Sequence, residues 1–112
     1  MILPLTVGKD PQFQTSPPSK SVVLEGDQVT IPCQAIGTPE PEITWYPVGE
    51  NSPLQNDSKY TIYANGSLLI RNVLKDDAKA YKCTAENLKG GIAKETRVEL
   101  ACEWQPYSFF MC

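Results

Sequence analysis

The sequence predicts an all-β fold, a sandwich or a barrel, on three observations. Short β-favouring runs recur at regular spacing, turns containing Pro and Gly separate them, and no stretch keeps the 3.6-residue period of a helix. The chain has 112 residues, of which 41% are hydrophobic. That length and composition fit one domain with one core.

The first part of the chain moves from an extended segment into a clear strand pattern. Residues 1–20 are rich in Pro, Ser, Thr and Gln, and indicate a leader with a short edge strand near Phe13. A short β-favouring run follows at 21–24. Residues 28–35 then alternate with period two, and Pro32 falls on the outward parity, where the sheet needs no donor. The expected inward residues of that strand are Val29, Ile31, Cys33 and Ala35.

The second part of the chain adds a hairpin and two long strands. Two short strands at 60–63 and 67–70 flank Ala64-Asn65-Gly66, and Asn-Gly is the strongest short hairpin signal. A helical turn is expected at 76–78, before the last two strands. The expected inward residues are Ile43, Trp45, Leu68, Ile70, Val73, Tyr81, Cys83, Ala85, Thr96, Val98 and Leu100.

Composition argues against several classes of function. Histidine is absent, which removes the usual general base and the commonest metal ligand, so we expect no enzyme and no cofactor. The net charge of −3 lacks the basic stripe of a nucleic-acid binder. No apolar run approaches the roughly 20 residues that span a bilayer, so no direct membrane insertion is expected. The even count of four cysteines favours disulfides and an oxidising compartment.

One constellation of residues narrows the fold further. Trp45 follows Cys33 by twelve residues, Cys83 follows Cys33 by fifty, and Tyr81 precedes Cys83 by two. With the segments LEGDQVTIPC, ITW, NGSLLI and DAKAYKCTAEN, these residues make the stretch from about Pro11 to Ala101 resemble an I-set immunoglobulin domain. The resemblance implies an immunoglobulin-like two-sheet Greek-key sandwich.

The resemblance also implies roles for individual residues. It implies a core disulfide between Cys33 and Cys83, with Trp45 packed against it and Tyr81 as a tyrosine corner. It further implies a salt bridge between Lys59 and Asp77. Lys79 stands where the family usually has glycine, which predicts strain or an altered turn at that corner. Of the adjacent Asp76 and Asp77, we expect structural roles only.

Two kinds of surface feature are candidates for function within the domain. Asn56-Asp57-Ser58 and Asn65-Gly66-Ser67 are N-glycosylation sequons, whereas Asn51-Ser52-Pro53 is excluded by its proline. The outward face of the third, sixth and seventh conserved strands supplies binding candidates, because an exposed tyrosine beside mixed charges suits recognition. These binding candidates are Tyr46, Lys82 and Glu86, flanked by Thr44 and Thr84, with Lys89-Gly90-Gly91 at the sandwich tip.

The last eleven residues do not belong to the family pattern. We expect a leader at 1–10, the domain at 11–101 and a Cys-flanked aromatic tail at 102–112. Three interpretations of the tail stay open: a local loop closed by Cys102 and Cys112, the start of a truncated neighbouring domain, or a segment that is foreign or bonded to another chain. Its aromatic residues Trp104, Tyr107, Phe109 and Phe110 are further binding candidates, and they favour self-association.

The function expected from these features is that of an extracellular protein-binding module in a secreted or cell-surface protein. The resemblance points to cell-adhesion or matrix proteins, and the partner would be another protein, bound homophilically or heterophilically. The alternative is a ligand-binding ectodomain module of a receptor tyrosine kinase or phosphatase. A mechanical intracellular domain is a third hypothesis, against which the sequons and the cysteine pair argue. The chain itself is expected to be a piece of a longer protein.

Overall fold

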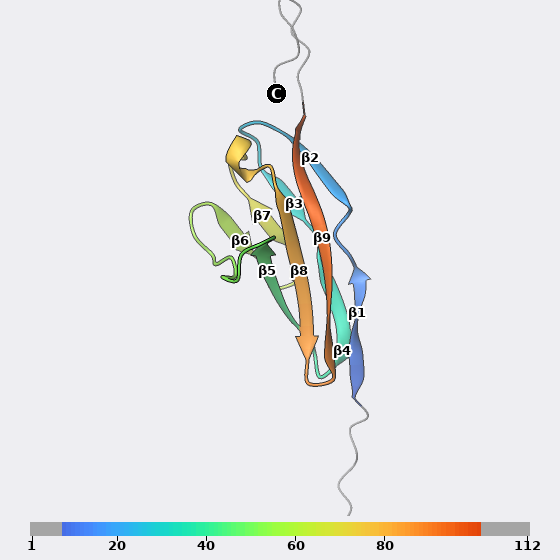
Figure 1. Ribbon diagram of the computed structural model, residues 1–112. Helices are drawn as coiled ribbons and strands as arrows, with labels where there is room; N and C mark the ends of the chain where they lie inside the picture. Colours follow the sequence, from blue (N-terminus) through green and yellow to red (C-terminus); the bar gives the residue numbers. More distant parts are fainter. Residues whose placement is uncertain (1–7, 102–112) are drawn as a thin grey trace, which may run out of the picture.

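The computed structural model describes residues 8–101, and this part of the chain is almost entirely β (Figure 1). One 3₁₀ turn is the only helical element in that range. The elements are β1 (Lys9–Thr15), β2 (Lys20–Leu24), β3 (Val29–Ile31), β4 (Gln34–Thr38), β5 (Glu42–Pro47), β6 (Tyr60–Ile62), β7 (Leu68–Ile70), η1 (Lys75–Asp77), β8 (Ala80–Asn87) and β9 (Gly90–Ala101).

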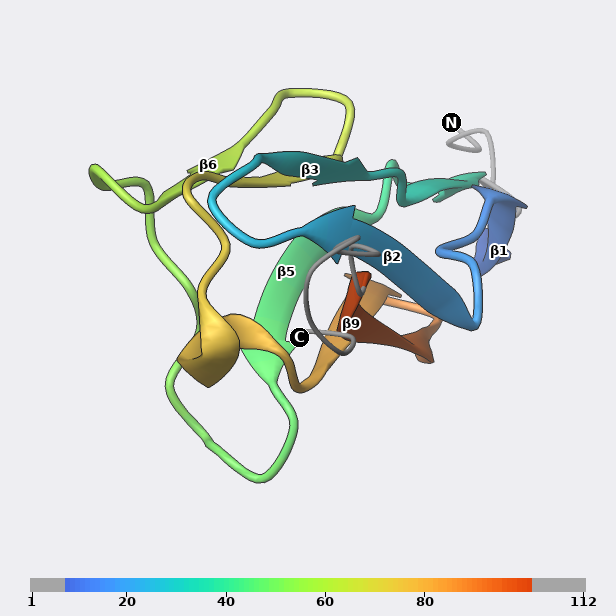
Figure 2. The same ribbon diagram turned by 90° about the horizontal axis from the view of Figure 1, so that it is seen from above.

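The strands form two facing layers, as the view from above shows (Figure 2). One layer is a four-stranded sheet in the order β2-β9-β8-β5, in which β2 runs parallel to β9 and the other pairs are antiparallel. The other layer contains β3-β7-β6 and the two-stranded ribbon β1-β4. The predicted all-β sandwich with immunoglobulin-like topology is therefore confirmed.

The strand expected over residues 28–35 is divided, which corrects the prediction of one continuous element. β3 ends at Ile31 and β4 begins at Gln34, so Pro32 and Cys33 lie in neither. β3 pairs with β7, whereas β4 pairs with β1. Proline has no N–H to give to a ladder, and it interrupts the pairing at the point where the chain changes partner.

Prolines also shape the first strand and its exit. β1 begins at Lys9, two residues before the expected domain start. Pro11 lies within a register shift of the β1–β4 ladder, where a missing N–H is tolerated. Pro17 is fully buried between β1 and β2, where the chain passes from one layer to the other. The edge strand predicted near Phe13 is present.

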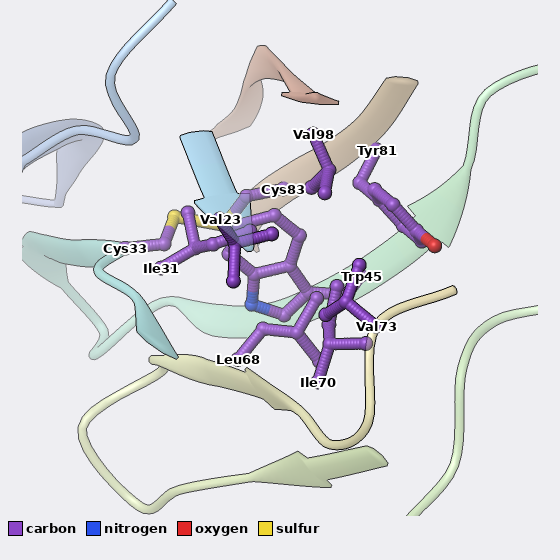
Figure 3. Close-up of a cluster of buried hydrophobic side chains, with 10 residues drawn as sticks. All are labelled: Val23, Ile31, Cys33, Trp45, Leu68, Ile70, Val73, Tyr81, Cys83 and Val98. Atoms are coloured by element: carbon purple, nitrogen blue, oxygen red, sulfur yellow. A yellow bond between two sulfur atoms is a disulfide. The ribbon is translucent and has the colours of Figure 1, made fainter. Parts of the chain in front are cut away.

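The core lies between the two layers and contains most of the residues that alternation assigns inward (Figure 3). Val29, Ile43 and Leu100 are only partly buried against it, and Ala35 is half-buried outside the cluster. Thr96 lies there too, and its hydroxyl is within hydrogen-bond distance of the Ser21 hydroxyl at 3.2 Å, so this buried polar pair is satisfied. Leu69 is 5% exposed although its parity points outward. The central cluster consists of Val23, Ile31, Cys33, Trp45, Leu68, Ile70, Val73, Tyr81, Cys83 and Val98.

Candidate functional site

The cysteines and aromatic residues of the family pattern serve the fold. A disulfide joins Cys33 to Cys83 across the two layers, as the resemblance implied, with a Cα–Cα distance of 6.7 Å. Trp45 is fully buried beside it, and its indole N–H donates to the Gly66 carbonyl at 2.7 Å. These side chains are sealed from solvent, so they hold the layers together and present nothing to a partner.

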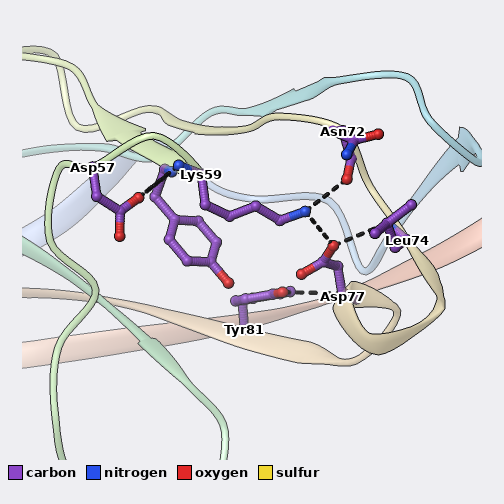
Figure 4. Close-up of polar contacts among 7 residues, drawn as sticks. Asp57, Lys59, Asn72, Leu74, Asp77 and Tyr81 are labelled. Atoms are coloured by element: carbon purple, nitrogen blue, oxygen red, sulfur yellow. Dashed lines mark hydrogen bonds and ion pairs between the residues drawn. The ribbon is translucent and has the colours of Figure 1, made fainter.

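Asp77 organises the corner where η1 leads into β8 (Figure 4). Its Oδ2 lies 2.6 Å from Lys59 Nζ and accepts a hydrogen bond from the Leu74 N–H at 2.9 Å. Lys59 Nζ also donates to the Asn72 carbonyl at 2.6 Å. The two partners of the Asp77 carboxylate, Lys59 and Leu74, lie just before β6 and just before η1. The Lys59–Asp77 ion pair implied by the resemblance therefore joins the start of β6 to η1.

The hydroxyl of Tyr81 completes this corner. It donates to the Asp77 carbonyl at 3.0 Å, which is the arrangement expected of a tyrosine corner. Burial raises the pKa of Tyr81 far above its usual range, and the nearby Tyr60 and Asp77 act in the same direction. The raised pKa favours the neutral phenol that donates this hydrogen bond.

Of the two outcomes expected at Lys79, strain or an altered turn, a strained left-handed backbone is not found. Among the described residues other than glycine, positive φ occurs at Asn72, and Lys79 does not share it. The Lys79 N–H donates to the Asp77 carbonyl at 2.9 Å, and its ammonium lies 5.8 Å from the centre of the Tyr81 ring. The corner thus turns without a left-handed residue at position 79.

The outer face of the four-stranded sheet brings the predicted binding residues of the domain together. Their outward side chains lie in cross-strand rows fixed by the register of β5, β8 and β9. One row is Tyr46, Lys82 and Glu95, the next is Thr44, Thr84 and Ala93, and the third is Glu42, Glu86 and Gly91. We call the nine residues of these three rows the row face. Sequence reasoning had missed Glu42, Ala93 and Glu95 as binding candidates, although alternation along β5 and β9 would have found them.

Charge is unevenly distributed along the row face. Glu42 and Glu86 are exposed and directly opposite each other on β5 and β8. Like charges in such a pair repel. Four residues before Glu86 on β8, the ammonium of Lys82 lies 5.5 Å from the centre of the Tyr46 ring. Within residues 8–101, the ion pairs include none of Glu42, Glu86 and Lys82.

The side chains of the middle row are short, and the Thr84 hydroxyl already has a hydrogen-bond partner within the sheet. Thr44, Thr84 and Ala93 have small side chains, and the Thr84 hydroxyl donates to the Thr44 carbonyl at 3.3 Å. No long side chain rises between the acidic row and the row that contains Lys82. A flat surface can therefore approach this face closely.

The β8–β9 hairpin forms the tip at which Lys89-Gly90-Gly91 was a candidate. The Asn87 amide nitrogen donates to the carbonyls of Lys9 and Pro39, each at 2.9 Å, and its oxygen accepts from the Lys89 N–H at 2.8 Å. This one side chain ties β1 and the β4–β5 loop to the hairpin. Leu88 is 92% exposed at the tip, and sequence reasoning had missed both residues.

The two sequon asparagines lie away from the row face. Asn56 and Asn65 are exposed, the first before β6 and the second in the turn between β6 and β7. Cys102, Trp104, Tyr107, Phe109, Phe110 and Cys112 lie outside the described residues. In residues 8–101 there is no group of three Cys, Asp or Glu side chains placed to hold a metal ion. None of the helical structure in that range has the length and apolarity to cross a bilayer.

Comparisons with known proteins agree with this geometry. A family model described as an immunoglobulin domain matches residues 10–87. Human Roundabout homolog 2 is 33% identical over 102 residues, which cover 86% of this chain and 7% of that protein. The chain spans less than a tenth of the length of the first curated relatives it matches, at 7% and 8%.

Two solved structures show how similar domains are used. The insect immune protein hemolin is 32% identical with a TM-score of 0.75, over 86% of this chain and 24% of that one. Its domain arrangement is described as having implications for homophilic adhesion. A chain from the complex of titin M10 with an obscurin-like 1 immunoglobulin domain is 27% identical with a TM-score of 0.76, over 84% of this chain and 96% of that one.

Proposed function

Because the chain belongs to the immunoglobulin domain family, we propose that it is an extracellular protein-binding module of an adhesion-type or matrix-type protein, with no catalytic role. The matches to Roundabout homolog 2 and hemolin support an adhesion-type module. We assign the binding to the row face, and we take a second copy of this chain as the partner.

The disulfide supports the extracellular setting over an intracellular mechanical one. Titin-like domains share the fold, so likeness to them does not decide the compartment. A bridge between cysteines 50 residues apart forms and persists in oxidising compartments, and is rare in the cytosol. In the chain-entropy model such a bridge stabilises the fold by about 4 kcal/mol.

The observation that carries the choice of partner is the charge pattern of the row face. Among residues 8–101, no ion pair includes Glu42 or Glu86 of the acidic row, or Lys82 on the other side of the low middle row. Lys82 has Glu95 as its cross-strand neighbour on β9. A two-fold axis through the middle row, at Thr84, would place Lys82 of each copy over Glu86 of the other. Such an isologous interface is self-complementary, and opposite charges across it favour this register.

The proposed function predicts that an arginine in the middle row blocks self-association. Ala93→Arg puts a long side chain on the two-fold axis, where the copies have to approach most closely. The matched control is Thr30→Arg, which adds the same side chain to an exposed position of β3 in the other layer. Both variants and the unmodified 112-residue chain are compared by sedimentation velocity over a concentration series.

We expect the unmodified chain and Thr30→Arg to self-associate alike, and Ala93→Arg to weaken the association at least about tenfold, equivalent to about 1.4 kcal/mol. Far-UV circular dichroism and a thermal melt confirm that both variants are folded. A monomeric unmodified chain would contradict the proposal, and so would an Ala93→Arg variant that associates as tightly as Thr30→Arg.

A further inference from the structure

Both sequon asparagines use the side-chain oxygen for a hydrogen bond that holds the fold, and within residues 8–101 the side-chain nitrogen makes none. The Asn56 side-chain oxygen accepts a hydrogen bond from the Ile62 N–H at 2.7 Å, and the Asn65 oxygen accepts one from the Ser67 N–H at 2.9 Å. A backbone N–H can only donate, so the oxygen has to face it in each case. The amide nitrogens of Asn56 and Asn65 consequently point away, without hydrogen bonds to the described residues.

We propose that Asn56 and Asn65 carry N-linked glycans and that these glycans cover the free edge of the β3-β7-β6 sheet. Both side chains are exposed, and each starts an Asn-X-Ser sequon. The bond that holds each asparagine uses only the oxygen, so a sugar on the nitrogen leaves it intact. The inference rests on the secretory route in the proposed function.

The modification is a group transfer from a lipid-linked oligosaccharide. The side-chain amide nitrogen forms a bond to the anomeric carbon of the first sugar, the bond from that carbon to the lipid pyrophosphate breaks, and the pyrophosphate leaves while the amide gives up one proton. Ser58 is exposed in the fold, whereas Ser67 is 9% exposed. Transfer at Asn65 therefore precedes closure of the β6–β7 hairpin.

The two positions protect one side of the sandwich. β6 is an edge strand of its sheet, and Asn56 already satisfies an outward N–H of that edge through Ile62. Unpaired edges invite pairing with other chains, and bulky solvated groups prevent it. Figure 2 shows β6 in the layer opposite β9. Glycans at Asn56 and Asn65 therefore lie away from the row face and leave it bare for docking.

The inference predicts site-selective glycosylation. The 112-residue chain, directed into the secretory pathway of mammalian cells by an added signal sequence, is purified from the medium and mapped by peptide mass spectrometry before and after enzymatic deglycosylation. We expect glycans on Asn56 and Asn65, and none on the exposed Asn51 and Asn72, which lack a usable sequon. Secreted, folded protein without glycan at Asn56 and Asn65 would overturn the inference.

Variants separate the glycan from the hydrogen bond. Ser58→Ala and Ser67→Ala destroy the sequons but keep both asparagine oxygens, so each should lose one glycan and keep the folded melting transition. The double variant should self-associate at the row face as the glycosylated chain does, but it should gain additional, higher-order association through the uncovered edge. If the double variant associated as the glycosylated chain does, with no higher-order species, the glycans would not shield the edge of the β3-β7-β6 sheet. Failure of Ala93→Arg to block self-association would refute the proposed function without touching the glycan result.

Discussion

Asp77 is the residue at which loop, turn and strand contacts of the corner converge. Its carboxylate holds Lys59 and the Leu74 N–H, and its carbonyl accepts from Tyr81 and from the Lys79 N–H. The side chains of the Lys59–Asp77 pair are 28% and 12% exposed, so each charge depends on the other. The Lys20–Glu99 pair differs, because its side chains are 59% and 41% exposed and 3.9 Å apart.

These different exposures predict that removing the Asp77 carboxylate costs more stability than removing the Glu99 carboxylate. Asp77→Ala should lower the free energy of unfolding by about 3 kcal/mol, because it leaves a half-buried ammonium and a turn N–H without their partner. Glu99→Gln, as the control, should cost less than about 1 kcal/mol, since exposed pairs contribute little. Urea unfolding at neutral pH measures both, and equal losses would contradict this account of the corner.

For single residues, the sequence predicted a contact where the family pattern gave that residue a role. The Lys59–Asp77 pair and the Tyr81 corner were expected from that pattern. The positive φ of Asn72 and the contacts of Asn87 were not, because both depend on which loops meet in space. For the same reason, the sequence could not show that the side-chain nitrogens of Asn56 and Asn65 make no hydrogen bond to the described residues.

Among the elements, the β6–β7 hairpin closely approaches the backbone of the disulfide cysteine Cys33. Its Gly66 has φ +95, its carbonyl accepts the Trp45 indole N–H, and a Cβ there would collide with the Cys33 carbonyl oxygen. Gly49, in the turn after β5, has a similar φ of +92, but nothing lies within 4 Å of the Cβ position. Comparing substitutions at Gly49 and Gly66 therefore distinguishes the cost of a left-handed backbone from the cost of a steric collision.

Alanine at these two positions should have different effects. Gly49→Ala should cost about 1 kcal/mol through the left-handed backbone alone. Gly66→Ala should cost roughly 2 kcal/mol more, because the hairpin has to move off the Cys33 backbone and disturb the indole bond. Thermal melts of the two variants test this. If Gly66→Ala were no worse than Gly49→Ala, the close approach of this hairpin to Cys33 would not be real.

For the strands, alternation predicted which face is buried. It did not predict which strands pair with each other. Parity placed Trp45, Tyr81 and Cys83 inward, and all three are fully buried. It could not show that Pro32 ends one ladder and lets β4 pair with β1, since a strand break and a strand bend have the same alternation. The parallel pairing of β2 with β9 joins segments far apart in the chain, and no local pattern encodes it.

For the whole molecule, the two layers differ in what they offer. The β3-β7-β6 layer carries both sequons, one before its edge strand β6 and one in the β6–β7 turn. The β2-β9-β8-β5 layer exposes the row face with its separated charges. The sequence placed Tyr46, Lys82 and Glu86 on one face through parity. The opposition of Glu42 and Glu86 required the register between β5 and β8, which only the structure provides.

The most direct test of the central claim exchanges charges across the proposed two-fold axis. Glu86→Lys should oppose two lysines at each contact, and Lys82→Glu should oppose two acids, so each variant alone should self-associate at least about tenfold more weakly than the unmodified chain. An equimolar mixture of the two variants should associate again, because every contact then joins a lysine to a glutamate. Sedimentation velocity of each variant and of the mixture decides the matter. If the single variants associate normally, or the mixture fails to restore association, the chain does not bind a second copy through this face.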